Sequence, residues 1–97
     1  MFIREATIED LEVLAKRCIN ACEREGWKRD WTEGGCYLHL EVSELIESLR
    51  GKKGLPDLEA ANVLFVLLAV LKHHNIKIDM VFKALDSYLT DMETVKV

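Results

Sequence analysis

The sequence predicts an all-α fold, and two observations lead to this prediction. Apolar residues recur at intervals of three and four along most of the chain, which is the period of a helix. No stretch alternates apolar and polar residues as a half-buried strand does. Turn-forming residues divide the pattern into four segments, so we expect a bundle of four helices. The 97 residues form a single domain, 1–97, because a chain of this length holds one hydrophobic core.

The first helix is expected to begin after Thr7, which is followed by "IED". A threonine hydroxyl caps a helix N-terminus, and acids in the first turn face the positive end of the helix dipole. Its apolar stripe consists of Ile8, Leu11, Leu14, Ala15, Cys18, Ile19 and Cys22. Gly26 is expected to end the helix. The following "WKRDWTEGG", residues 27–35, is interpreted as a connector because it contains a glycine pair.

The second helix is expected to begin after residue 35 and to end at "GKKGLPD", because glycine and proline do not continue a helix. Its apolar stripe consists of Leu38, Val42, Leu45, Ile46 and Leu49. Beside the stripe lie Glu41, Glu44 and Glu47, three residues apart, with Glu47 furthest from the apolar side. Like charges at this spacing repel by a few tenths of a kcal/mol. Helix stability therefore does not explain the three acids: either water screens them or a cation binds there.

The third helix is predicted to be capped by Asp57 at its start and Asn75 at its end. Between residues 60 and 71 every residue except Asn62 is apolar. A helix that is apolar on all faces is buried on all faces, and three other short helices are too few to surround it. We therefore expect a bundle that is completed by homo-oligomerisation.

The fourth helix is predicted to begin at Asp79, which can cap it. Its inward-facing residues are expected to be Ile78, Val81, Phe82, Leu85, Tyr88, Leu89 and Met92.

The charge and hydropathy of the chain exclude several classes of partner. The net charge is −4, which argues against a nucleic acid polymer or an anionic membrane as the main partner. The opening "MFIREATIED" is polar from its fourth residue, and the longest apolar run is too short to span a bilayer. We expect a soluble, cytoplasmic protein.

Three cysteines raise the alternative of a small helical interaction module with structural zinc. Cys18, Cys22, Cys36 and His39 loosely match the spacing of a zinc site. Cys18 and Cys22, however, fall on an apolar helical stripe, where cysteine acts as a small apolar side chain. We favour the second interpretation.

The third helix repeats the acidic spacing of the second with Glu59 and Asn62. The short link between the helices favours antiparallel packing, so both pairs can face one cleft. Carboxylate and amide oxygens on facing helices suit Mg²⁺ or Mn²⁺, and a polar Asn62 within an apolar run needs a partner. Against this, Glu-x-x-Glu on an amphipathic helix is usually a solvated face, and a buried Asn can set the register of an oligomer.

A family resemblance runs through the same residues. The segments "LEVSELIESLRGKKG" and "DLEAANVLFVLLAVLKHHNIKID" resemble the MazG-type all-α nucleoside triphosphate pyrophosphohydrolases. That family is marked by Glu-x-x-Glu, a helix–loop–helix gap and Glu-x-x-Asp. Here the pattern is Glu41 and Glu44, fourteen residues, then Glu59 and Asn62. The upstream "EREGW" also resembles the family, and the similarity covers roughly residues 8–85.

The resemblance implies Mg²⁺-dependent hydrolysis of a nucleoside triphosphate to a monophosphate and pyrophosphate. It also implies a homodimer or homotetramer, in agreement with the apolar third helix. Glu41, Glu44 and Glu59 carry over as metal ligands, with Asn62 at the position of the fourth. The metal would neutralise the phosphates and activate a water, and Glu41 or Glu44 would take the proton of that water.

Two departures from the family pattern bear on activity. Asn62 replaces an aspartate, and the phosphate-binding lysine and asparagine of the last helix are out of register, with Lys83 nearby and Asp86 near the expected lysine position. Lys52 and Lys53 can compensate, although a solvated loop is the simpler interpretation. The runner-up is therefore a catalytically weakened relative that binds nucleotide or a protein partner.

Two tryptophans complete the candidate substrate-binding set with Lys83. Trp27 and Trp31 flank "KRD" just before the acidic helix. They anchor the connector in the core, or one of them stacks on the nucleobase.

Overall fold

Four α-helices make up the part of the chain that the computed structural model describes, which is residues 7–25 and 32–94, with the backbone alone for 32–36. They are α1 (Ile8–Arg24), α2 (Thr32–Leu49), α3 (Pro56–His73) and α4 (Ile78–Thr94). No strand occurs within these residues, so the predicted all-α class is confirmed. None of the four helices combines the length and the hydropathy needed to cross a membrane.

The start of α1 is as predicted. The Thr7 hydroxyl accepts a hydrogen bond from the Asp10 backbone N–H (3.2 Å), and the Asp10 carboxylate accepts one from the Thr7 N–H (3.1 Å). This reciprocal pair satisfies two backbone donors that have no partner inside the helix.

α2 and α3 begin at other residues than the sequence predicts. α2 begins at Thr32 and includes Gly34 and Gly35, which the sequence assigns to the connector. A glycine in a helix costs only about 1 kcal/mol, so the pair does not prevent helix formation. α3 begins at Pro56, with Leu55 rather than Asp57 at the N-cap. Proline suits the first helical position because its φ is already helical and it has no N–H to leave unpaired.

The start of α4 also differs, because the helix begins at Ile78 and Asp79 lies within its first turn. The cap is supplied from α1: the Ile78 N–H donates to Oε2 of Glu12 over 3.3 Å. A carboxylate at this end of the helix is favoured by the helix dipole. Glu12 therefore ties the start of α4 to α1.

α2 and α3 end in the same way, each with one residue in the left-handed conformation. Gly51 (φ 72°) follows α2, and Asn75 (φ 57°) follows the C-cap His74 of α3. After α2, the Lys52 N–H donates to the Glu47 carbonyl and the Gly51 N–H to the Ser48 carbonyl. The same pair of bonds closes α3, so both helices end in a Schellman motif.

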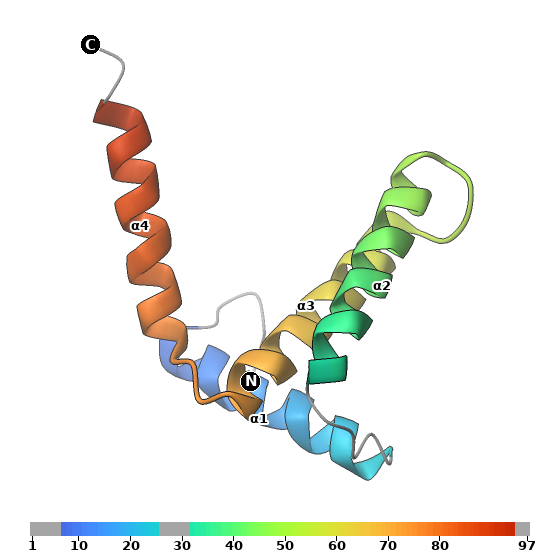
Figure 1. Ribbon diagram of the computed structural model, residues 1–97, viewed down its shortest axis with the longest axis horizontal. Coiled ribbons are helices and arrows are strands. Elements are labelled where there is room, and N and C mark those ends of the chain that lie inside the picture. Colours follow the sequence, from blue (N-terminus) through green and yellow to red (C-terminus); the bar gives the residue numbers. More distant parts are fainter. Residues whose placement is uncertain (1–6, 26–31, 95–97) are drawn as a thin grey trace.

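The core lies where α1 crosses the C-terminal half of α3, and the start of α4 closes it. Its buried members are Ala15, Cys18, Ile19, Cys22, Leu68, Ala69 and Ile78. α2 packs along α3 through a separate contact, and Figure 1 shows the two helices side by side, joined by the loop at residues 50–55. This antiparallel hairpin holds the acidic residues of both helices.

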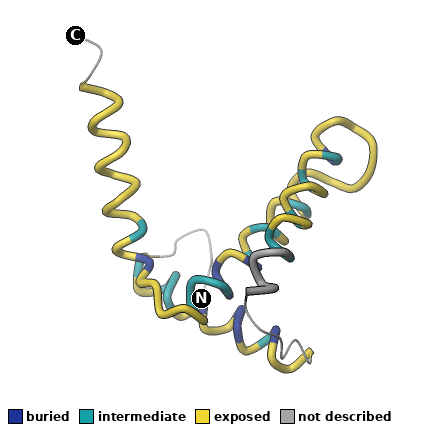
Figure 2. Tube along the Cα trace, viewed as in Figure 1, coloured by how far each residue is buried: buried dark blue, intermediate teal, exposed yellow. Residues whose placement is uncertain are grey.

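α4 leaves the other three helices after its first turn. Figure 1 shows it pointing away from the α2–α3 pair, and Figure 2 shows exposed residues along almost its whole length. The prediction that its apolar stripe faces inward is wrong within the single chain: only Ile78 is buried and Val81 half-buried, whereas Phe82, Leu85, Tyr88, Leu89 and Met92 are exposed.

The apolar run of α3 is likewise only partly covered by the chain itself. Val66, Leu68 and Ala69 are buried, but Leu64 and Leu67 are exposed. The Cα radius of gyration is 15.4 Å, against about 13 Å for a compact domain of this length. The chain is therefore more open than a closed bundle.

Candidate metal centre

Three glutamates from two helices meet on the α2–α3 hairpin. Glu41 and Glu44 lie one helical turn apart on α2, and Glu59 lies in the first turn of α3. One carboxylate oxygen from each can be chosen so that all three lie within 4.8 Å of one another. The arrangement follows from the short loop, which makes α2 and α3 antiparallel neighbours.

Two of these carboxylates have an oxygen that is buried without a hydrogen-bond partner. These atoms are Oε2 of Glu41 and Oε2 of Glu59, and both side chains are half-buried, whereas Glu44 is exposed. Burial raises the pKa of Glu41 above the ordinary glutamate range, and the neighbouring charges of Glu44 and Glu59 raise it further. An unpaired carboxylate oxygen removed from water is costly, and within the described residues neither of these two oxygens has a hydrogen-bond partner that would offset the cost.

A cavity of about 400 Å³ adjoins two of the three carboxylates, those of Glu44 and Glu59. Its lining includes Glu44, Glu47, Lys53, Gly54 and Glu59. A cavity of this size is within the range that holds small ligands. Metal ligands and a substrate can therefore share one wall.

Glu47 lies closer to the protein interior than the sequence suggested. Helical spacing puts it furthest from the apolar side, but it is half-buried while Glu44 is exposed. The Arg50 and Lys52 N–H groups both bond to the backbone carbonyl of Glu47, in the turn that ends α2. Helical periodicity alone does not predict the half-burial of its side chain.

Asn62 is exposed in the single chain, which corrects the expectation that it is buried and needs a partner. It lies one turn after Glu59 on α3, beside the exposed Ala60 and Ala61. An exposed amide is hydrated by water, so burial does not require it to have a partner. Its candidacy as a ligand therefore depends on its spacing from Glu59 alone.

The remaining candidates for substrate binding do not join the cluster in a single chain. Trp27 and Trp31 lie outside the described residues. Lys83 and Asp86 are exposed on α4, which packs against α1 and points away from the hairpin (Figure 1).

The two cysteines of α1 behave as apolar core residues. Cys18 and Cys22 are free and buried, and burial is the main cause of a raised pKa for both thiols. A thiol must lose its proton to bind zinc, so this environment opposes the zinc alternative. The side chain of Cys36 lies outside the described part of the chain, and His39 is exposed.

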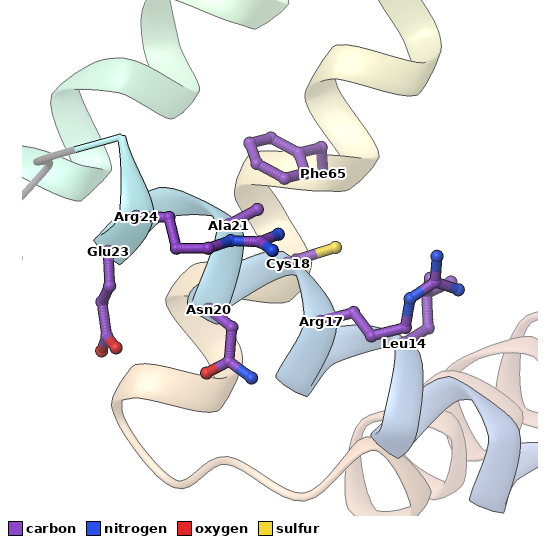
Figure 3. A pocket seen from close by; sticks show the side chains of 8 residues that line it. All are labelled: Leu14, Arg17, Cys18, Asn20, Ala21, Glu23, Arg24 and Phe65. Atoms are coloured by element: carbon purple, nitrogen blue, oxygen red, sulfur yellow. The ribbon is translucent and has the colours of Figure 1, made fainter.

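The larger hollow in the surface lies away from the glutamates. It measures about 930 Å³ and runs along α1, with Arg17, Cys18 and Arg24 from that helix and Phe65 from α3 (Figure 3). Sequence reasoning did not identify it, because its residues share no motif. It contains none of the three clustered carboxylates, so the candidate chemistry remains at the smaller cavity.

Comparisons with protein-family models, with curated proteins and with solved structures gave no match to this chain. What the site can do must therefore be argued from its own residues.

Proposed function

We propose that the chain is a Mg²⁺-dependent nucleoside triphosphate pyrophosphohydrolase of the MazG type that acts as a homo-oligomer. One observation carries the proposal: Glu41, Glu44 and Glu59 converge from two antiparallel helices, and two of their oxygens are buried without a partner. The spacing of these acids is also the one on which the family resemblance rests.

The three carboxylates fit a hard divalent cation. Mg²⁺ and Mn²⁺ prefer oxygen ligands and commonly bind one or two carboxylates together with substrate phosphates. The orphaned oxygens of Glu41 and Glu59 are the ligands that gain most from such an ion, because nothing else in the described structure bonds to them. When bound, Mg²⁺ supplies charge neutralisation for the phosphates and lowers the pKa of an attacking water.

The exposure of each carboxylate suggests which ones bind the metal and which one acts as the general base. Glu41 and Glu59 are half-buried and hold the ion. Glu44 belongs both to the cluster and to the cavity wall and is exposed, so it is our candidate for the general base. Its carboxylate would take a proton from the water that attacks the α-phosphorus. The bond from that phosphorus to the bridging oxygen breaks, and its electron pair leaves with pyrophosphate.

The homo-oligomer is supported by the apolar surface that the chain leaves uncovered. Leu85, Leu89 and Met92 form one stripe of α4 and are 51%, 49% and 63% exposed. Leu64 on α3 and Leu49 on α2 are exposed as well. Exposed apolar stripes of this extent mark interaction sites in soluble proteins, and a second copy offers the same stripes for burial. We place this assembly in the cytoplasm, where free cysteines such as Cys18 and Cys22 persist.

A catalytically weakened relative that binds nucleotide or a protein partner is the second candidate. Asn62 supplies no charge to the site, and the acid Asp86 lies near the position where the family pattern has a phosphate-binding lysine. Both differences reduce the attraction for Mg²⁺ and phosphate without removing the three carboxylates.

The test is a pyrophosphate-release screen of the purified protein. It covers ordinary and modified nucleoside triphosphates, with Mg²⁺ and with Mn²⁺. We expect metal-dependent release with at least one nucleotide, and no release after Glu59→Gln. Nucleotide binding without release would favour the second candidate.

A further inference from the structure

Lys53 is the basic side chain on the wall of the acidic cavity. Among the described lining residues, the other charged groups are the carboxylates of Glu44, Glu47 and Glu59. Lys52, the preceding residue, belongs to the same loop and is also exposed but is not among those lining residues. Both residues are therefore exposed lysines of one loop, but only Lys53 is a lining residue of the cavity.

The loop that carries Lys53 is anchored on both sides. Gly51 precedes the lysines with φ 72° and belongs to the Schellman motif that ends α2. Gly54 follows them with φ 82°, and a Cβ on it would lie 3.3 Å from Cγ of Glu59. The backbone next to Lys53 thus lies against the side chain of a clustered carboxylate. This anchoring keeps the backbone of Lys53 beside the cavity that the residue lines.

A polyphosphate in this cavity needs a cation besides the metal. A nucleoside triphosphate is highly anionic, and the cavity wall already carries three carboxylates. Uncompensated like charges this close together are strongly unfavourable. Within a single chain Lys83 does not meet the need, because α4 points away from the hairpin (Figure 1).

We propose that Lys53 binds the β- and γ-phosphates of the substrate and so holds the pyrophosphate leaving group. This inference rests on the proposed function, since it assigns a substrate contact within that site. Lysine is a common phosphate ligand. Here Lys53 would bind the phosphates in place of the last-helix lysine of the family pattern, which is out of register in this chain. Because Lys53 lies on the cavity wall, the ligand must be a chain of phosphates that is long enough to reach from the metal to Lys53.

The experiment measures binding of inorganic tripolyphosphate by calorimetry in the presence of Mg²⁺. Because this ligand has no nucleobase, the result does not depend on which nucleotide is the substrate. Lys53→Ala should weaken this binding about tenfold, the effect of losing one charge-assisted contact. Lys53→Arg should retain most of it, and the matched control Lys52→Ala should stay within about twofold of the parent protein. Mg²⁺ binding without tripolyphosphate should be unchanged or tighter in Lys53→Ala, since a positive charge is removed.

Several outcomes separate this inference from the proposed function. Equal effects of Lys53→Ala and Lys52→Ala, or no tripolyphosphate binding by the parent protein, would overturn it. The inference would also be overturned if Lys53→Ala bound Mg²⁺ more tightly than the parent protein but bound tripolyphosphate with the same affinity. Lys53 would then only offset the negative charge of the glutamates. Failure of the proposed function would be seen in a different experiment, the nucleotide screen, as a lack of pyrophosphate release from every nucleotide.

Discussion

The carboxylates of Glu41 on α2 and Glu59 on α3 lie in one cluster, and each has its Oε2 atom buried without a hydrogen-bond partner. The two carboxylates repel each other, and each has one oxygen that has lost water. A cation between them would remove both costs. The metal dependence of stability should therefore report on this pair directly.

Glu41→Gln should raise the melting temperature of the metal-free protein at neutral pH by roughly 2–4 °C. The pKa of Glu41 is raised in the folded state, so the folded protein binds this proton more tightly than the unfolded chain does. Stability is then lost as pH rises from the ordinary glutamate range through the raised value. The gain of the variant should shrink to nothing near pH 4 or below. Thermal melts across pH measure this.

In the same melts, Mg²⁺ should stabilise the parent protein but not Glu41→Gln, because the variant lacks a charged ligand. If Mg²⁺ raised both melting temperatures equally, Glu41 would not be a ligand.

Gly54→Ala should both destabilise the protein and weaken Mg²⁺ binding. A left-handed φ costs a non-glycine residue about 1–2 kcal/mol, and the new Cβ would press on Cγ of Glu59 at 3.3 Å. Chemical denaturation and a Mg²⁺ titration of the same sample give the two readouts.

Gly51→Ala is the matched control, because Gly51 is also left-handed but a Cβ there would meet nothing within 4 Å. It should lose stability to a similar degree and keep its Mg²⁺ affinity. Loss of affinity in both variants would show that the loop acts through general stability and not through Glu59.

The double substitution Leu85→Glu with Leu89→Glu should convert an oligomer to a monomer. Both side chains are exposed in the single chain, so the charges would cost little within one copy but would prevent burial of the stripe between copies. Analytical ultracentrifugation at micromolar concentration measures the change.

The control for this stripe is Ser87→Glu with Thr90→Glu, two exposed positions on the opposite side of α4. This variant should sediment as the parent does. A parent protein that sediments only as an 11 kDa species would contradict the assembly outright.

Asn62→Asp should tighten Mg²⁺ binding several-fold, since a carboxylate is a stronger ligand for a hard dication than an amide. Asn62 is exposed, so the new charge should change the stability of the metal-free protein by less than about 1 kcal/mol. Calorimetry and thermal melts with and without Mg²⁺ check both parts. A large loss of stability that Mg²⁺ did not restore would place Asn62 in a buried contact instead.

Local signals in the sequence predicted the helices and the meeting of the glutamates. The helical period fixed the four elements, and Thr7 with Asp10 fixed the start of α1. The short glycine- and proline-containing loop predicted an antiparallel hairpin. That hairpin brings Glu41 and Glu44 close to Glu59.

Features that depend on packing could not be predicted in the same way. Periodicity shows which side of α4 is apolar, but it does not show whether the same chain covers that side, and for Leu85 and Leu89 it does not. The half-burial of Glu47 and the position of Lys53 at the cavity are of the same kind. Gly51 and Gly54 indicate where the chain turns, but they do not indicate which side chains the turn brings to the cavity.

The most direct test of the central claim identifies the products of turnover by ³¹P NMR. The protein is incubated with Mg²⁺ and a mixture of the common ribo- and deoxyribonucleoside triphosphates in ¹⁸O-labelled water. We predict equimolar monophosphate and pyrophosphate, with the label in the monophosphate, because water attacks the α-phosphorus. Glu44→Gln should abolish turnover because it removes the proposed general base, whereas Glu47→Gln should retain most of it, since Glu47 lines the cavity but is not among the three clustered carboxylates. The account would be contradicted if the products were nucleoside diphosphate and orthophosphate, or if the parent protein and Glu44→Gln had equal turnover.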